Sequence, residues 1–428
     1  MKYKILFFPF IAFLMLSFSF CKNGNDMNKK NVGSTSVSGD STEQPYVLNP
    51  VRKYSDLVND CYKLHYDAIV VDAHNDFFYQ VYKRGANFNR KDAGTQTGLD
   101  RLTEGGIKLQ GFSFWTDSEN MKNAYNFTKN LIGKSKKIES ENLDRFKFAE
   151  SFDDIVETMN SGKLCGFMGI EGGSPIENDL DRINEFYNLG VRYITLTWNN
   201  SNKIGTSSKD ESGKKIKGGL TEYGYEVIKR MDELGIIIDV SHAGEQTFWD
   251  VIKTTMNPII ASHSNCYSIC PHYRNLTDEQ IKAIAENGGV IMVNFYDEFI
   301  DINANAIRTQ NVYQKYSKEL REIFNANSND MIKFNVEREN FLATIDLSGG
   351  VSIDKLIDHI DYIYKLVGAD YIGFGSDFDG GITPPNELYD GTCYPIITRI
   401  LAERGYTEIE IRKILGLNFL RVFKQVCG

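Results

Sequence analysis

Five histidine and carboxylate residues stand at or just after the ends of apolar segments spread along the chain. His74 and Asp76 follow the first of these segments, Glu171 ends the third, and His242 and His263 end the fifth and sixth. Imidazole and carboxylate groups together are ligands for zinc and similar divalent metals. The two-residue spacing puts His74 and Asp76 on one face of an extended chain, where they can chelate one ion. His242 and His263 can form a second pair, and Glu171 can join two ions that activate a water molecule.

Each of these motifs also has an ordinary structural interpretation. An isolated His-x-Asp is often a surface turn, and a single histidine after a strand is more often a hydrogen-bonded core residue than a ligand. The occurrence of five such residues at the ends of four of these segments favours a metal centre. The other three histidines, His65, His272 and His359, lie in an amphipathic segment, a polar loop and an outer helix. We expect none of these three to bind metal.

Eight apolar segments must position the candidate ligands, and their pattern predicts eight buried strands. Their continuous apolar character suits parallel strands that are covered on both faces. They are Ala68–His74, Ile107–Trp115, Leu164–Glu171, Val191–Trp198, Gly235–His242, Asn257–His263, Gly289–Phe295 and Ala369–Asp377. Polar residues that end so many strands would all meet at one end of a closed parallel barrel.

Helical patterns fill the intervals between these segments. Val227, Ile228, Met231 and Leu234 recur at helical spacing, and Gly235 ends that helix. Residues 278–287 form another helix, capped by a threonine at position 277. Eight strand–helix units predict a (β/α)8 TIM-type barrel, with a doubly wound open sheet as the alternative. We expect residues 51–428 to form this single domain.

One long interval interrupts the strand–helix rhythm after the seventh strand. It spans Tyr296–Val351 and mixes helical with irregular sequence. We interpret it as an enlarged loop insertion at the mouth of the barrel, and we expect it to cover the site.

The first fifty residues read as an export signal followed by a tether. Lys2 and Lys4 precede an apolar run over residues 5–20, which is shorter than the ~20 residues of a comfortable membrane span. Cys21 follows directly, as in a bacterial lipoprotein signal, although Phe20 stands where a small residue is usual. We expect a signal peptide over 1–20, lipidation of Cys21 and a flexible tether over 21–50. Plain secretion and an uncleaved anchor are the alternatives. The expected location is the bacterial envelope or periplasm, at the membrane through the lipid.

Charge and cysteine content limit the function further. The net charge is −9 at pH 7, and no basic cluster is present. Nucleic-acid binding needs such clusters, so we expect no nucleic-acid partner. The six cysteines beyond Cys21 could form three disulfides in an exported protein, but we favour buried free thiols.

Six sequence motifs together resemble the membrane dipeptidases, also called renal-type dipeptidases, peptidase family M19 of the amidohydrolase superfamily. The resemblance covers residues 52–427. The motifs are HNDF, GIEGG, DVSHAG, ASHSNCYSICPHYRNLTDEQI, GFGSDFDG and KILGLNFLRVF. The resemblance implies a (β/α)8 barrel with two zinc ions. By motif, His74 and Asp76 would bind one ion, His242 and His263 the other, and Glu171 would bridge them. A hydroxide between the ions would hydrolyse L-Xaa-L-Xaa or L-Xaa-D-Xaa dipeptides.

The same resemblance suggests roles in substrate binding. Arg274 would bind the free carboxylate of the dipeptide, and Asp377 would bind its amino group and transfer the proton to the leaving amine. Trp198 departs from the family, since mammalian members have a histidine there that helps to hold the scissile carbonyl. A homodimer is a further expectation from the resemblance. The alternatives are another binuclear metallo-amidohydrolase, acting on cyclic amides, lactones or N-acyl amino acids, and a non-catalytic surface-binding lipoprotein.

Overall fold

The structure, a computed structural model, describes most of the chain beyond the first fifty-three residues. The described ranges are 54–89, 91, 94–214, 216, 218–304, 312–342, 344–345 and 350–428. The predicted signal peptide, Cys21 and the tether lie outside these ranges. Within them, no helix combines the length and the apolar character that crossing a membrane requires.

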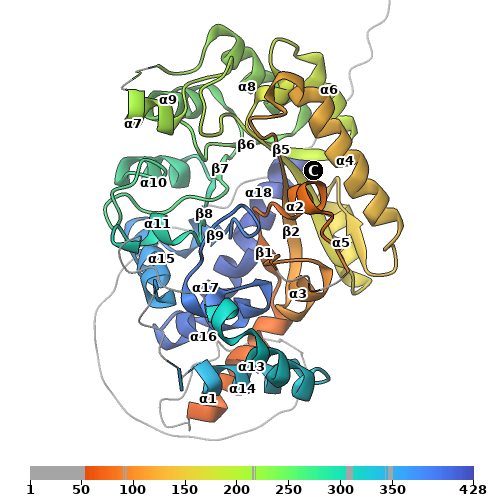
Figure 1. Cartoon of the computed structure of the whole chain (residues 1–428). Helices are drawn as coiled ribbons and strands as arrows, with labels where there is room; N and C mark the ends of the chain where they lie inside the picture. The colour runs from red at the N-terminus through yellow and green to blue at the C-terminus, as the bar shows by residue number, and fades with distance from the viewer. Residues whose placement is uncertain are drawn as a thin grey trace, which may run out of the picture. The chain divides into compact units, whose positions relative to one another are not determined.

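Eight parallel strands form the barrel, and each corresponds to one of the eight predicted segments (Figure 1). In order around the sheet they are β1 (Val70–Asp72), β2 (Ile107–Trp115), β4 (Leu164–Glu171), β5 (Val191–Thr195), β6 (Ile237–Asp239), β7 (Ile260–Ala261), β8 (Val290–Val293) and β9 (Ile372–Phe374). The ends of the sheet then meet. Ala73 N–H donates to Phe374 O at 2.8 Å, and Asp76 N–H donates to Phe378 O at 2.9 Å. The barrel prediction is confirmed, and this closure excludes the open sheet.

A ninth strand, β3 (Phe146–Phe148), was not predicted from the sequence. It pairs in parallel with the start of β4, where Phe146 lies opposite Leu164. The neighbouring barrel strand β5 pairs with β4 only from Met168 onward, so the edge before that residue is open to another strand. Both phenylalanines of β3 are buried, which stabilises the short strand against the outside of the barrel.

Helices surround the strands of the barrel (Figure 1). Up to β8 they are α1 (Tyr54–Asp67), α2 (Phe77–Arg84), α3 (Leu99–Glu104), α4 (Ala124–Ser140), α5 (Phe152–Asn160), α6 (Asp181–Asn188), α7 (Ser208–Lys214), α8 (Glu222–Leu234), α9 (Glu245–Thr254) and α10 (Asp278–Glu286). After β8 they are α11 (Asp297–Ile300), α13 (Val312–Asn327), α14 (Met331–Leu342), α15 (Ile353–Val367), α16 (Tyr394–Glu403), α17 (Glu408–Arg412) and α18 (Asn418–Cys427).

The two helices singled out in the sequence have the predicted ends. The Thr221 side chain caps α8, which ends at Gly235 in the left-handed conformation with φ 75°. Thr277 and Gln280 form a reciprocal capping box at the start of α10. These caps satisfy amide groups that have no partner within the helix.

Inside the barrel, an apolar layer at the floor lies below a polar mouth at the carboxyl ends of the strands. Phe167 of β4 contacts Phe419 and Phe423 of α18, with ring centroids 4.9 and 5.8 Å apart. Val71, Leu109, Tyr193, Ile237, Ile260 and Met292 belong to the same buried cluster. Helix α18 therefore closes the barrel floor, and the candidate ligands stand above it at the carboxyl ends of the strands.

All six described cysteines are free thiols, and five of them are fully buried. The expectation of buried thiols is confirmed for these five, while Cys427 is half-buried. The three-disulfide alternative is wrong.

Candidate metal centre and substrate cavity

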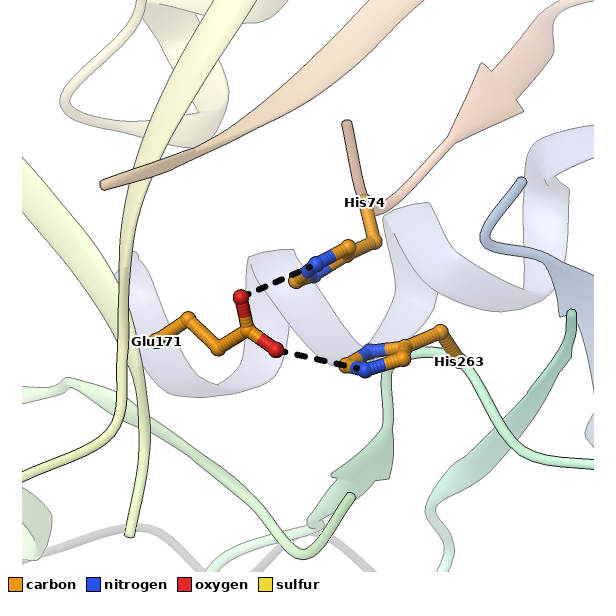
Figure 2. Close-up of side chains that lie close together, drawn as sticks. All are labelled: His74, Glu171 and His263. Atoms are coloured by element: carbon orange, nitrogen blue, oxygen red, sulfur yellow. Dashed lines mark ion pairs between the residues drawn. The ribbon is translucent and has the colours of Figure 1, made fainter. Parts of the chain in front are cut away.

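The five predicted ligand residues converge above the barrel floor. Each is buried, and each comes from a different point on the strand ends of β1, β4, β6 and β7. Glu171 lies at the centre, with His74 and His263 directed toward its carboxylate (Figure 2). Glu171 Oε1 is 2.9 Å from His242 Nε2 and 3.5 Å from His263 Nε2. Its other oxygen, Oε2, is 3.7 Å from His74 Nε2, which is itself 3.8 Å from Asp76 Oδ2.

The arrangement of donor atoms fits metal ions. His74 forms one compact group with Glu171 and His263 and another with Asp76 and Asp377, with all ligand atoms of a group within 4.8 Å of each other. Within the described residues, His74 Nε2 and Asp76 Oδ1 are buried without a hydrogen-bond partner. Unpaired buried polar atoms are costly, and a cation would satisfy both of them. The second group also brings Asp377 next to the ligands, where the sequence interpretation had given it roles in substrate binding and catalysis.

A short contact between two imidazole nitrogens supports the same conclusion. The Nε2 atoms of His242 and His263 lie 3.0 Å apart, and only one of them can carry the proton of a hydrogen bond between them. Both nitrogens face Glu171. A metal ion accepts a lone pair from each imidazole, so it suits this position better than a proton does.

A second layer of hydrogen bonds orients two of the histidines. His263 Nδ1 is 2.7 Å from Ser262 Oγ, which donates to Asp239 Oδ2 at 2.6 Å. His74 Nδ1 is 3.2 Å from Tyr193 OH. These contacts turn each Nε2 toward the centre, as in most protein metal sites. The sequence interpretation missed this layer, although Asp239 is the polar residue that ends a buried strand in DVSH.

A second buried aspartate links the two strands at the closure of the barrel. Asp72 accepts hydrogen bonds from Ser376 N–H at 2.8 Å and Ser376 Oγ at 2.6 Å, and from His74 N–H at 3.3 Å. It thereby fixes the strand ends that carry His74 and Asp377.

The backbone is strained at two site residues. His242 has φ 66° and Asp377 has φ 62°, in the left-handed region that non-glycine residues rarely adopt. Such conformations cost on the order of 1–3 kcal/mol each and are concentrated at functional sites. Gly380 leaves the space that the carboxylates need, because a Cβ there would lie 2.3 Å from Asp377 Oδ1 and 2.6 Å from Asp76 Oδ2.

The electrostatics of the centre favour a bound cation. Burial lowers the pKa of His74, but the charges of Glu171 and Asp76 outweigh burial and raise that pKa to about 10. Burial also raises the pKa of Glu171, yet the neighbouring histidines, led by His74, hold it well below its usual value. Burial and the charge of Glu171 raise the pKa of Asp76 well above its usual value. Without metal, the single positive charge on His74 faces the carboxylates of the centre. A divalent cation would neutralise the negative charge of these carboxylates more fully.

A cavity of about 410 Å³ opens above the centre. Arg274, Trp198 and Asp377 all line it together with ligand residues. The Arg274 side chain is buried, and its hydrogen bonds are long: 3.3 Å from Nη2 to His263 O and 3.5 Å from Nη1 to Ser264 Oγ. Within the described residues its Nε atom has no hydrogen-bond partner. The guanidinium therefore retains donors for an anionic ligand.

An aromatic wall stands beside the metal centre. Trp198 packs against Trp115 with centroids 4.9 Å apart and lies 6.3 Å from the His242 ring. The Tyr79 ring also lies 4.8 Å from the Trp115 ring, and all three of these large side chains line the cavity. Trp115 and Tyr79 were not identified from the sequence. The available signal was the position of Trp115 at the end of a predicted strand.

Among the described residues of the insertion after β8, those that line the cavity lie in or next to its first turn. Tyr296 and Phe299 line the cavity, whereas no residue of α13 or α14 whose side chain the structure describes does so. Helix α14 packs elsewhere: Asn335 donates to Tyr66 OH at 2.8 Å, and Arg338 donates to Thr392 O at 2.8 Å. Helix α13 packs on α14, where the Tyr316 ring lies 5.8 Å from the Phe341 ring. The expectation that the insertion covers the site is wrong for the described residues of α13 and α14, because α14 binds α1 and the turn before α16 and α13 packs on α14.

The three remaining histidines lie away from the ligand cluster. His65 contacts Thr398 Oγ1 at 2.7 Å and Gly105 O at 2.8 Å. His359 is bonded to Cys266 N–H and to Ile300 O. Both are satisfied core residues. His272 lines the cavity, but it belongs to neither of the metal-type groups.

The comparisons with known proteins agree with this geometry. An uncharacterized dipeptidase from Schizosaccharomyces pombe is 30% identical over 377 residues, covering 84% of this chain and 80% of that protein. Among solved structures, a metallo peptidase from Rhodobacter sphaeroides, liganded with a phosphinate mimic of the dipeptide L-Ala-D-Ala, is 24% identical with a TM-score of 0.69, over 84% of this chain and all (100%) of that one. The probable dipeptidase PvdM from Pseudomonas aeruginosa is 21% identical with a TM-score of 0.72, over 87% of this chain and 99% of that one. These two structures share the fold. The family match itself spans residues 58–427, and the chain belongs to the membrane dipeptidase family, peptidase family M19.

Proposed function

We propose that this metal-dependent dipeptidase uses two zinc ions to hydrolyse dipeptides whose amino and carboxyl ends are both free. The observation that carries the proposal is the convergence of three imidazoles on the two oxygens of Glu171. His74 and Asp76 would hold one ion, His242 and His263 the other, and Glu171 would bridge them. When bound, such a pair of ions lowers the pKa of a water molecule and polarises the scissile carbonyl.

Arg274 would bind the C-terminal carboxylate of the substrate. Its guanidinium is buried in the cavity wall and retains unpaired donors. A guanidinium matches a carboxylate through two parallel hydrogen bonds, which are stronger than neutral ones. The cavity volume of about 410 Å³ suits a small ligand such as a dipeptide.

Asp377 would bind the substrate amino group and move the proton to the leaving amine. Asn294 Nδ2 donates to its Oδ2 at 3.1 Å, which leaves the other carboxylate oxygen for the substrate. Burial raises its pKa, and the charge of His74 partly offsets burial, so that the pKa lies at about 6. A carboxylate with this pKa can accept a proton and return it near neutral pH.

The aromatic wall of Tyr79, Trp115 and Trp198 would select the substrate. It narrows the cavity beside His242, so small N-terminal side chains should be preferred. The dipeptide mimic held by the Rhodobacter sphaeroides relative ends in a D-residue, which supports acceptance of L-Xaa-D-Xaa as well as L-Xaa-L-Xaa substrates.

The test is hydrolysis by purified, zinc-loaded protein of a panel of L-L and L-D dipeptides. N-acetylated and C-amidated versions of each dipeptide are the controls. We expect cleavage of the free dipeptides, with Gly and Ala preferred at the N-terminal position, and poor cleavage of both capped forms. Equal rates on capped and free substrates would argue against the assigned roles of Arg274 and Asp377.

The proposed setting is the bacterial envelope. The layout of residues 1–21 supports export and lipid attachment at Cys21, which would hold the enzyme at a membrane. We also propose a homodimer, which light scattering of the zinc-loaded enzyme would test.

A further inference from the structure

His272 lies on the same cavity wall as Arg274, in the loop between β7 and α10. The loop is held in place by its own hydrogen bonds. Asn275 Nδ2 donates to Cys270 O at 2.9 Å and to Phe299 O at 2.8 Å, and Asn275 N–H donates to His272 O at 2.9 Å. The position of the imidazole is therefore fixed before any substrate enters.

Aromatic packing fixes the orientation of the imidazole. The His272 ring lies 4.2 Å from the Tyr273 ring and 4.6 Å from the Phe299 ring, centroid to centroid. The Arg274 guanidinium carbon is 5.4 Å from the same Phe299 ring. One aromatic side chain thus supports both the imidazole and the guanidinium.

A hydrogen bond determines which ring nitrogen of His272 carries the proton. The backbone N–H of Arg274 donates to His272 Nδ1 at 3.2 Å, so this nitrogen must be the acceptor. Burial and the charge of Arg274 lower the pKa of His272 to about 4, so the ring is neutral near pH 7. The single ring proton then lies on Nε2. Within the described residues no protein partner occupies that atom, and the His272 side chain lines the cavity.

We propose that His272 Nε2–H donates a hydrogen bond to the C-terminal carboxylate of the dipeptide, next to Arg274. This proposal rests on the proposed function of Arg274 and extends it. A carboxylate has about four acceptor positions, and a guanidinium fork occupies two of them. A neutral donor two residues away, locked on the same wall, can take a third without repelling the guanidinium.

Two variants separate the Nε2 donor from the role of the loop. In His272→Asn the side-chain oxygen can still accept from Arg274 N–H, as in an Asx-turn, but the distal donor is lost. In His272→Gln a side-chain amide can place a donor near the position of Nε2. We expect His272→Asn to raise KM for free dipeptides roughly 10-fold with little change in kcat, since the lost bond is to a charged group. His272→Gln should recover most of this loss, and zinc content and melting temperature should match the wild type in both.

Amidated dipeptides are the decisive control, because they lack the carboxylate. We expect His272→Asn to change their kcat/KM by less than about twofold. An unchanged KM for free dipeptides, or an equal loss on free and amidated substrates, would overturn the proposal for His272. If Arg274→Met impairs free dipeptides selectively while His272→Asn does not, only the His272 proposal fails. If Arg274→Met has no selective effect either, the proposed carboxylate site itself fails.

Discussion

Asp377 combines two features that rarely occur together in an ordinary surface loop. Its backbone is left-handed with φ 62°, and its half-buried carboxylate stands beside His74 and Asp76 while accepting a hydrogen bond from Asn294. The strained backbone holds the carboxylate over the cavity, where a proton donor and acceptor is required.

We predict that Asp377→Asn retains both metal ions and lowers kcat by about 10²–10⁴-fold. The amide keeps the size of the side chain but cannot accept the proton. Elemental analysis alongside steady-state kinetics checks this prediction. Loss of one metal ion together with activity would instead identify Asp377 as a ligand.

The protonation of His74 predicts how zinc binding depends on pH. Burial lowers its pKa, but Glu171 and Asp76 raise it to about 10, so the metal-free imidazole is charged at pH 7.5. Zinc requires the neutral nitrogen, so binding must release this proton, and affinity should rise with pH toward 10. Calorimetric titration in Tris and in phosphate should give different binding enthalpies. The difference should be at least the difference between the ionisation enthalpies of the two buffers for one proton. Identical enthalpies in the two buffers would contradict the assignment.

At the scale of elements, the barrel strands and their polar ends were the features that the sequence predicted best. Each of the eight barrel strands was predictable, because a parallel strand buried on both faces is a continuous apolar run that a polar residue ends. The capping box at α10 was predictable from Thr277 for a similarly local reason. The strand β3 was not, because three residues give no periodicity and its stability comes from a partner edge on β4.

The support layer beneath the ligands was also missed. Asp239 and Ser262 are separated by 23 positions, and only the pairing of β6 with β7 brings them together. The same limit applies to the insertion, where α14 binds α1 through a side chain whose partner is far along the chain. Contacts of this kind depend on register and packing, which no local pattern encodes.

We predict that Ser262→Ala lowers the affinity for one zinc ion by about 10–100-fold, because the His263 ring loses the hydrogen bond at Nδ1 that orients it. Thr277→Ala is the matched control, since it also removes one hydroxyl but lies at the cap of α10. It should cost about 1 kcal/mol in unfolding free energy and leave zinc affinity unchanged. Zinc competition with a chelator and urea unfolding would measure the two effects. Equal zinc affinities for the two variants would refute the orienting role of Ser262.

At the scale of the whole molecule, barrel closure brings the first and last strands together at the site. His74 and Asp377 lie at opposite ends of the folded sequence, yet Asp377 N–H donates to His74 O at 3.1 Å. The sequence supported this juxtaposition only through the expectation of a closed barrel. The family resemblance added the roles of Arg274 and Trp198, and the structure places both side chains in the cavity wall.

The N-terminal fifty residues yield a prediction of their own. If Cys21 is lipidated, the full chain expressed in a bacterium should incorporate labelled fatty acid and sediment with membranes. Cys21→Ser should lose the label and remain in the supernatant with its activity intact, because all proposed metal and substrate residues lie between positions 74 and 377. Membrane sedimentation of Cys21→Ser to the same extent as the wild type would argue for an uncleaved anchor.

The central claim is that a pair of zinc ions, joined by Glu171, performs the hydrolysis. The most direct measurement is a titration of metal-free protein with zinc, in which bound zinc and the rate of L-Ala-L-Ala and L-Ala-D-Ala cleavage are followed together. We predict that the rate reaches its maximum at two ions per chain, and that Glu171→Ala, handled identically, retains less than one ion. A maximum rate at one ion per chain, or full activity without metal, would contradict this account.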